Sequence, residues 1–416
     1  MSAVKSNKLK SYHIPWGAWY GDESLKIDFP VSWEVDKMQI VDAPGLQQDK
    51  IIDLLNKPYG RGRLKDSVKN KKKIVIAVED ITRPAHLELV LLPIVNELLK
   101  AGIEKEKITF LICNGAHAPM LNSDIRKKIG LEILKNFIIH NHNPYDNLSD
   151  TGIILGKTPV RVNRYFHEAD FRIIVGSIIP HSFAGFSSGA KLVLPGLADI
   201  ATLERSHKYV MMGFRGGVND VETNKFRSEI EDVVSKIGID FFIGVVPNSK
   251  REPAGIFAGD LIEAHRKGVD FARIIFQTHI QHPSDIAVLN AYPKDSELLQ
   301  ADAALTPLKT IPSEIVKEKG VYIICTKCSN GFGYHSLFGP GMRLTRKPIK
   351  KGFLKGRDLI VFSPNVNQAE FKMLYWEGYY FADTWESVLS YLKEKYPAQC
   401  KISIYPNAPL QLLEGI

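Results

Sequence analysis

The 416-residue sequence has no apolar run of the roughly 18 residues that a membrane-spanning helix requires. The first eight residues, Met-Ser-Ala-Val-Lys-Ser-Asn-Lys, lack the apolar core of a signal peptide. We find no internal repeat and no low-complexity segment. These absences argue against a membrane-embedded or repeat protein, and we expect a cytoplasmic location and no membrane partner.

Cysteine is also scarce, and four residues do not build a disulfide framework. Cys325 and Cys328 have the spacing of a redox or zinc pair, but a structural zinc site needs a second pair of ligands, and none lies nearby. Cys325 ends an apolar segment, 321–325. A buried thiol is therefore the expected state.

The net charge is +8 and the pI is near 9.0, which suits nucleic acid or anionic small molecules. The lysine runs at 71–73 and 350–351 lack the interleaved aromatic residues of a nucleic-acid platform. We interpret them as solvated surface and expect no nucleic-acid partner. With 44% hydrophobic and 24% charged residues, the chain has the composition of a globular protein of two or three domains.

Short β-branched segments alternate with helical segments along the whole chain, a pattern typical of parallel α/β sheets. We expect helices at about 84–100, 125–137, 200–212 and 260–276. The expected strands are 74–78, 107–113, 171–178, 240–246, 285–289, 321–325, 358–362 and 401–405. The pattern begins again after the fourth helix, so we predict two α/β domains with mostly parallel sheets, residues 1–272 and 273–416.

Polar clusters follow three of these strands: 79–84, 114–120 and 180–181. In open α/β sheets, ligands bind outside the carboxyl ends of the strands. The three clusters can therefore converge in one crevice. Each has a plainer interpretation, because Asp80 and Thr82 could cap a helix and His117 could bind backbone in a turn.

The segment 176–198 carries the most specific pattern: His181, a loop rich in glycine and serine, and Lys191 among small and apolar residues. Such a loop lets backbone N–H groups approach a phosphate. A lysine in apolar surroundings can have a lowered pKa and act as a nucleophile. His207 follows within a helical segment, where it could be an ordinary helix residue. The other histidines have no comparable setting, and His140 and His142 are expected to be loop residues.

These residues resemble the nickel-dependent lactate racemase family, whose enzymes use a nickel-pincer nucleotide. The resemblance covers nearly the whole chain. Asp80-Ile-Thr-Arg-Pro84 matches the family's Asp-x-Thr-Arg-Pro motif, and Gly115-Ala-His-Ala-Pro119 matches Gly-x-His-x-Pro. The segment 180–196 matches a long Pro-His…Ala-Lys…Leu-Pro-Gly motif, and a later family histidine matches His207.

The resemblance implies a cofactor, pyridinium-3,5-bisthiocarboxylic acid mononucleotide with nickel. It implies that Lys191 tethers the cofactor as a thioamide and that His207 is a nickel ligand. His117 and His181 would be the two catalytic histidines, in a cleft between the domains. The further residues implied to bind the cofactor are Asp80, Thr82, Arg83, Gly185, Ser188, Gly189 and Gln300.

The implied reaction is racemisation or epimerisation of a 2-hydroxy acid by reversible hydride transfer from the substrate α-carbon to the tethered cofactor. A histidine can take and return the hydroxyl proton near neutral pH. Two are needed because the enantiomers present their hydroxyls on opposite sides. The implied partners are the small-molecule hydroxy acid and the cofactor biosynthesis enzymes, and self-association into a homo-oligomer is left open.

The chain departs from the lactate pattern at four positions. Ser188 replaces a glycine and Ala118 an arginine, while Leu299 and Ala303 replace a tyrosine and a lysine near Tyr292-Pro-Lys-Asp295. We therefore predict a 2-hydroxy acid other than lactate. Two alternatives remain: a non-catalytic protein that binds the cofactor or a hydroxy acid, and a phosphate- or nucleotide-binding enzyme with Lys191 as a Schiff-base lysine.

Overall fold

The computed structural model describes residues 8–211, 217–280, 282–310 and 315–414. Its first domain is built on a six-stranded sheet in which every neighbouring pair is parallel except β12 and β13. In order across the sheet, the strands are β13(Pro253–Gly259), β12(Phe241–Pro247), β9(Phe171–Ser177), β4(Ile74–Glu79), β5(Ile108–Cys113) and β6(Ile138–Asn141).

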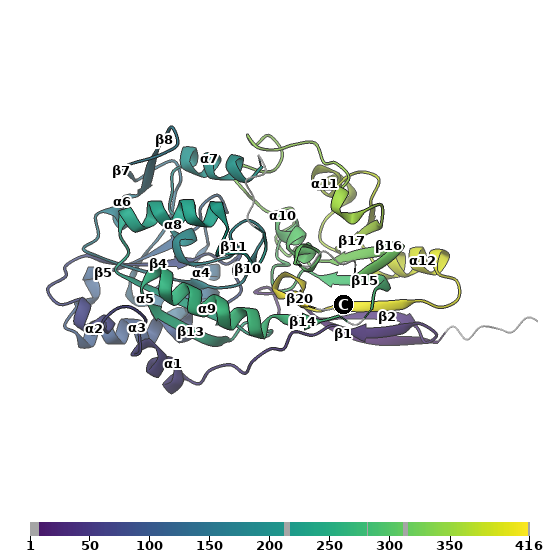
Figure 1. Cartoon of the computed structure of the whole chain (residues 1–416), viewed down its shortest axis with the longest axis horizontal. Coiled ribbons are helices and arrows are strands. Elements are labelled where there is room, and N and C mark those ends of the chain that lie inside the picture. The colour runs from purple at the N-terminus through teal and green to yellow at the C-terminus, as the bar shows by residue number, and fades with distance from the viewer. Residues whose placement is uncertain (1–7, 212–216, 281, 311–314, 415–416) are drawn as a thin grey trace, which may run out of the picture.

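The central strand β4 is buried along its whole length, as expected for a parallel sheet covered on both faces. Its residues alternate between two cores. Ile76 packs with α1(Gln48–Leu55), α2(Leu64–Ser67), α3(Glu88–Lys100), α4(Asn122–Ile129) and α5(Leu131–Asn136) on one face. Ala77 packs with α8(Lys225–Ile237) and α9(Leu261–Ile275) on the other. Figure 1 shows this layered arrangement.

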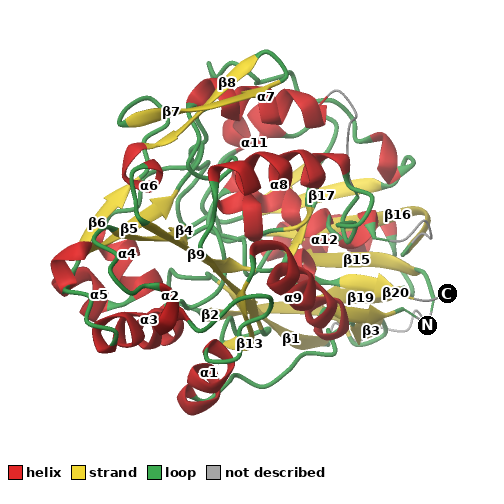
Figure 2. Cartoon of the chain, turned by 60° about the vertical axis from the view of Figure 1, so that its left-hand side comes forward, coloured by secondary structure: helices red, strands yellow, loops and turns green. Residues whose placement is uncertain are grey.

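The second domain contains a fully parallel six-stranded sheet. Its strands, in order, are β18(Tyr380–Ala382), β17(Asp358–Phe362), β16(Val316–Cys325), β15(Ser284–Asn290), β19(Lys401–Tyr405) and β3(Glu34–Lys37). Every strand expected from the sequence is therefore present, and the prediction of two α/β domains with mostly parallel sheets is confirmed. Figure 2 shows the two sheets side by side in the molecule.

The N-terminal segment lies with the second domain, although it precedes the first in sequence. β1(Leu9–Trp16) and β2(Glu23–Pro30) form an antiparallel hairpin, and β3 pairs with β19 at the edge of the second sheet. Trp16 and Phe29 of the hairpin pack in the same core as Val288 of β15. The boundary at residue 272 stays a prediction. The strand pairing shows in addition that β1–β3 pack with the second domain.

Two of the expected helices differ from the prediction. The helix expected from Pro84 begins at Glu88, because the carbonyl groups of Arg83 and Ala85 accept hydrogen bonds from Lys128 Nζ instead of from a following helical turn. The helix expected over 125–137 is two helices, α4 and α5. Gly130 separates them, and its φ of 89° does not belong to a helix.

The remaining elements connect the two sheets and cover them. The larger ones are β7(Leu148–Leu155), β8(Thr158–Asn163), α6(Arg164–His167), α7(Ile200–Met211), α10(Leu298–Ala301), α11(Gln368–Leu374) and α12(Trp385–Lys395). The short strands are β10(Pro180–His181), β11(Gly185–Phe186), β14(Gln277–His279) and β20(Leu412–Glu414). Among the described residues, no helix combines the length and apolar character needed to cross a membrane.

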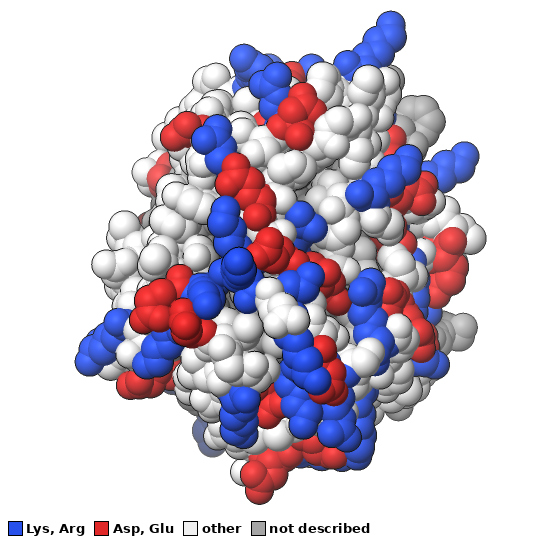
Figure 3. All heavy atoms as spheres, turned by 90° about the vertical axis from the view of Figure 1, so that its left-hand side faces the viewer, with Lys and Arg blue, Asp and Glu red and all other residues white. Residues whose placement is uncertain are grey.

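The expectation of buried thiols agrees with the structure. All four cysteines are free and buried, including Cys325 and Cys328. On the face of the first domain in Figure 3, basic and acidic side chains are intermixed over the surface. Such mixing is typical of a solvated surface.

Candidate active site

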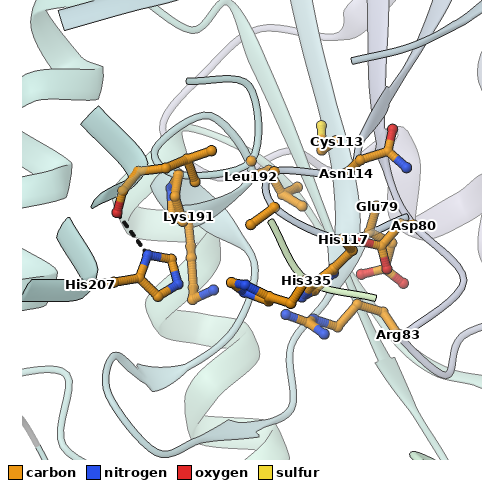
Figure 4. Close-up of a pocket in the computed structure, with 15 residues that line it drawn as sticks. Glu79, Asp80, Arg83, Cys113, Asn114, His117, Lys191, Leu192, His207 and His335 are labelled. Atoms are coloured by element: carbon orange, nitrogen blue, oxygen red, sulfur yellow. Dashed lines mark hydrogen bonds and ion pairs between the residues drawn. The ribbon is translucent and has the colours of Figure 1, made fainter. Parts of the chain in front are cut away.

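The candidate site lies at the carboxyl ends of three adjacent strands. β4 is hydrogen-bonded to β5 on one side and to β9 on the other, so the polar clusters that follow these strands meet. This is the point at which the strand order reverses, where ligands bind in α/β sheets. Figure 4 shows Asp80 and His117, which follow β4 and β5, together with Lys191, which comes from the longer loop after β9.

A cavity of about 260 Å³ joins the two domains at this point. The first domain contributes His117, His181, Lys191 and His207, together with apolar side chains. The residues contributed by the second domain are Leu299, Gln300, His335 and Phe338. A smaller adjoining cavity is lined by Asp80, Arg83 and Asn114 as well as by His117, Lys191 and His207. The expected cleft between two domains is therefore present.

His117 is oriented by an acidic partner. Its Nδ1 lies 2.7 Å from Asp80 Oδ2. Asp80 also accepts hydrogen bonds from Thr82, whose hydroxyl accepts one from Arg83. Burial alone would raise the pKa of Asp80, but its contact with His117 and the charge of Arg83 hold that pKa well below its usual value. An ionised carboxylate only accepts, so Nδ1 carries the hydrogen and Nε2 of the neutral ring has a free lone pair.

His181 has the opposite arrangement. Its Nδ1 accepts hydrogen bonds from the backbone N–H groups of Phe183 at 3.1 Å and Ala184 at 3.3 Å. In the neutral ring the hydrogen must then reside on Nε2. Burial, followed by the charges of Lys191 and Arg83, holds the pKa of His181 well below its ordinary value. His181 therefore presents an N–H donor, whereas His117 presents a lone pair.

Lys191 lies in a short 3-10 helix, Gly189–Leu192, and its side chain extends into the cavity (Figure 4). Burial, with the charges of Arg83 and Arg227, holds the pKa of this amine well below its usual value. Lowering the pKa favours the neutral amine, which is the nucleophilic form. The geometry is suited to a covalent link.

His207 is placed by α7, where its Nδ1 lies 2.8 Å from the carbonyl oxygen of Leu203 (Figure 4). Nδ1 donates to that carbonyl, so Nε2 presents a lone pair to the cavity. Burial lowers the pKa of His207 to about 4, which keeps the ring neutral. A neutral imidazole whose other nitrogen is fixed by a carbonyl is the usual form of a metal-binding histidine. Beside it, the buried hydroxyl of Ser206 has no hydrogen-bond partner among the described residues and borders the same cavity.

The glycine- and serine-rich loop is packed into the first domain. Arg227 is fully buried and donates to the carbonyl oxygens of Ala184, Phe186 and Ser188. Ser188 donates to Gly176 O at 3.0 Å and has a φ of 65°, a left-handed conformation that glycine adopts more readily. Gly185, Ser188 and Gly189 are all buried and do not line either cavity. Their expected contact with the cofactor stays a prediction, and the visible role of this loop is to fix the backbone beside His181.

Of the four positions that depart from the family pattern, Ser188 is in the buried loop of the first domain, Ala118 is at the rim, and Leu299 and Ala303 are in the second domain beside Gln300, which matches the pattern. Gln300 and Leu299 lie on α10, and both line the cavity. Ala303 follows in a 3-10 helix, Asp302–Leu305. Ala118 is exposed, and its carbonyl accepts a hydrogen bond from Asn114. The cavity wall provided by the second domain thus combines the apolar Leu299 and Phe338 with the polar Gln300 and His335.

His335 lines both cavities, although its sequence context does not predict a functional setting. Its backbone pairs with that of His117, and Ser336 N donates to Ala116 O at 2.8 Å. The ring centroid of His335 lies 5.5 Å from that of His117 and 5.4 Å from that of His207. A glycine-rich segment, 331–341, carries it, and this composition was the available signal.

Comparisons with known proteins show which proteins this chain is similar to. Residues 20–217 match the lactate racemase N-terminal domain. Lactate racemase from Thermoanaerobacterium thermosaccharolyticum is 29% identical over 294 residues, which are 69% of this chain and 67% of the relative. Lactate racemase from Lactiplantibacillus plantarum is 29% identical over 301 residues, 70% of this chain and 69% of the relative.

Two solved structures share the fold of the whole chain. The lactate racemase apoprotein from Thermoanaerobacterium thermosaccharolyticum has a TM-score of 0.76 and 22% identity, covering 98% of this chain and 100% of that one. A protein from Thermotoga maritima has a TM-score of 0.68 and 21% identity, covering 90% of this chain and 99% of that one. The two-domain arrangement is therefore common to these proteins.

Proposed function

We propose that this chain, which belongs to the lactate racemase family, is an isomerase that racemises or epimerises a 2-hydroxy acid. The observation that carries the proposal is the pairing of His117 and His181 on one cavity, where Nε2 is available in both rings, as a lone pair on His117 and as an N–H donor on His181. Inverting a carbon that bears a hydroxyl requires one group that takes the hydroxyl proton and another that returns a proton on the opposite side of the substrate. A lone pair and an N–H donor on the same cavity provide the two functions.

The residues also suit the nickel-pincer nucleotide that the family resemblance implies. Lys191 would hold it covalently, and Nε2 of His207 would bind the nickel, for which an imidazole donor is suitable. The unpartnered hydroxyl of Ser206 on the same cavity is consistent with a ligand there. When bound, the cofactor would supply a hydride acceptor that returns the hydride to either face of the substrate carbon.

The protein residues have separate tasks in this scheme. His117 takes the hydroxyl proton at Nε2, and Asp80 stabilises the imidazolium that results. Arg83 provides positive charge beside the cavity for the substrate carboxylate. His181 donates from Nε2 to the C2 oxygen, and for the other enantiomer it acts as the base. Closure of the two domains around the cavity limits the access of water to the reacting atoms.

We further propose that the substrate is not lactate. Leu299 stands where the family pattern has a tyrosine, and together with Phe338 it adds apolar contacts to a wall that also carries Gln300 and His335. The cytoplasm is the proposed location, because it is where cofactor biosynthesis enzymes would meet the protein. We propose no nucleic-acid partner.

The test begins with cofactor loading. The protein is co-expressed with the cofactor-making enzymes, and nickel per chain and the mass of the Lys191 peptide are measured. We expect about one nickel per chain and a covalent mass increase. The Lys191→Ala variant should lose the adduct, whereas His207→Ala should keep the adduct and lose nickel. An unchanged adduct in Lys191→Ala would remove the tether assignment, and full nickel retention in His207→Ala would remove the ligand assignment.

The loaded protein is then given single enantiomers of lactate, 2-hydroxybutyrate, mandelate and malate, and the loss of optical purity is followed. Conversion of a panel member other than lactate is the expected result. A loaded protein that binds these acids without changing their configuration would favour a non-catalytic binding protein. A protein without nickel that forms a reducible imine at Lys191 would instead favour a Schiff-base enzyme.

A further inference from the structure

His335 is the site histidine to which the proposed reaction gives no task. It comes from the second domain, whereas His117, His181 and His207 come from the first. It lines both cavities and lies between the rings of His117 and His207. Figure 4 shows its ring directed at the same space as the end of Lys191.

The hydrogen-bond pattern of His335 fixes which nitrogen faces this space. Nδ1 accepts a hydrogen bond from the backbone N–H of Leu337 at 3.2 Å. The lone pair of Nδ1 is thereby used, so Nε2 of the neutral ring carries the hydrogen. Phe338 packs beside the ring, at 4.9 Å between centroids, and restricts its rotation. The side chain therefore offers an N–H donor and no lone pair.

This pattern separates His335 from a metal ligand. His207 has Nδ1 bound to a carbonyl and a lone pair at Nε2, as a ligand requires. His335 has the reverse arrangement, because a backbone N–H points at its Nδ1. The partner of His335 must be a hydrogen-bond acceptor in the cavity. The substrate of the proposed reaction has acceptor oxygens next to its C2 hydroxyl.

We infer that His335 is a substrate-binding residue that donates its Nε2 hydrogen to the carboxylate of the 2-hydroxy acid. The inference rests on the proposed function. With the two rings 5.5 Å apart, His117 can reach the hydroxyl oxygen while His335 reaches a carboxylate oxygen of the same molecule. The other second-domain residues that line this cavity are Leu299, Gln300 and Phe338, and His335 is the one among them whose ring also contacts the ring of His117.

The test compares His335→Phe, which keeps a ring without a donor, with His335→Gln, which keeps an N–H donor. The substrate is the member of the hydroxy-acid panel that the parent protein racemises. A hydrogen bond to a charged group predicts that KM rises about ten- to a hundredfold in His335→Phe, while kcat changes by less than about threefold. His335→Gln should recover most of the loss in KM. Nickel per chain and the adduct mass should equal those of the parent in both variants.

The matched control is His140→Phe, because His140 stacks on Tyr165 and lines neither cavity. An unchanged KM in a folded His335→Phe variant would overturn the inference, and so would a loss of nickel in both variants. If His335→Phe does not fold, ¹⁵N NMR of the labelled parent decides: hydrogen on Nδ1 of His335 overturns the inference, and hydrogen on Nε2 supports it. A nickel-loaded parent that converts no panel member would instead count against the proposed function.

Discussion

The settings of His117 and His181 differ in what fixes the imidazole ring. The side chain of Asp80 holds His117, and its carboxylate can stabilise the positive charge when the ring takes up a proton. Backbone N–H groups of Phe183 and Ala184 hold His181, and these donors oppose a hydrogen on Nδ1. His117 is therefore ready to be a base, whereas His181 must give up its backbone hydrogen bonds before Nε2 can accept a proton. Two histidines with equivalent tasks in a racemase need not begin from equivalent states.

The largest expected effect comes from removing either ring. His117→Ala and His181→Ala should each lower racemisation in both directions by about 10²–10⁴-fold, because the overall equilibrium is fixed and each turnover uses both groups. Nickel and the adduct should be retained. Trapping of the keto acid should show opposite enantiomer preferences, with a higher yield in His181→Ala, where the ready base remains. Racemisation near the parent rate in either variant would make that histidine structural.

The next prediction makes the two histidines alike. In Asp80→Asn, the side-chain amide can donate to Nδ1 of His117, which would move the hydrogen to Nε2. The ring then resembles that of His181, and we expect kcat to fall by about 10²–10³-fold. Steady-state kinetics in both directions and ¹⁵N NMR of the histidines measure the change.

Asp53→Asn is the control for this substitution, because Asp53 lies on α1 and pairs with Lys50 and with Lys57, which follows that helix, away from the site. It should leave the rate unchanged. If Asp80→Asn retains the parent rate while its ¹⁵N spectrum shows the hydrogen on Nε2, the carboxylate is not what makes His117 the base.

The smallest expected effect weakens the backbone setting of His181. Arg227 holds the three carbonyl groups of the adjoining loop, and Arg227→Lys cannot satisfy all of them from one ammonium group. We expect about 1–3 kcal/mol lower stability, measured by denaturant unfolding. Formation of the keto acid from the enantiomer for which His181 is the base should slow more than its formation from the enantiomer for which His117 is the base.

Arg273→Lys is the matched control for that variant, since Arg273 pairs with Glu222 at a more exposed position. Its stability should stay within about 0.5 kcal/mol of the parent. Equal slowing of both half-reactions in Arg227→Lys would show that the loop does not act through His181.

The parts of the molecule that sequence could predict are those set by local pattern. The apolar run at 74–78 could only be a buried strand, and the polar residues after it then had to lie at the sheet edge. His335 could not be placed in this way, because its position depends on a loop of the second domain pairing with Ala116 and His117 of the first. The burial of Ser188 likewise depends on Arg227, about forty residues later, whose sequence context carries no sign of that contact.

The pairing of β3 with β19 has a consequence for synthesis of the chain. Glu34 and Lys401 are partners in that ladder, so β3 cannot pair until β19, about 370 residues later in the chain, has been synthesised. At a ribosomal rate of about 5–20 residues per second, the wait is roughly 20–70 s. During this time the first domain can complete its sheet, while β3 has no strand to pair with. The β3 segment is therefore a place where a chaperone would have a long opportunity to bind.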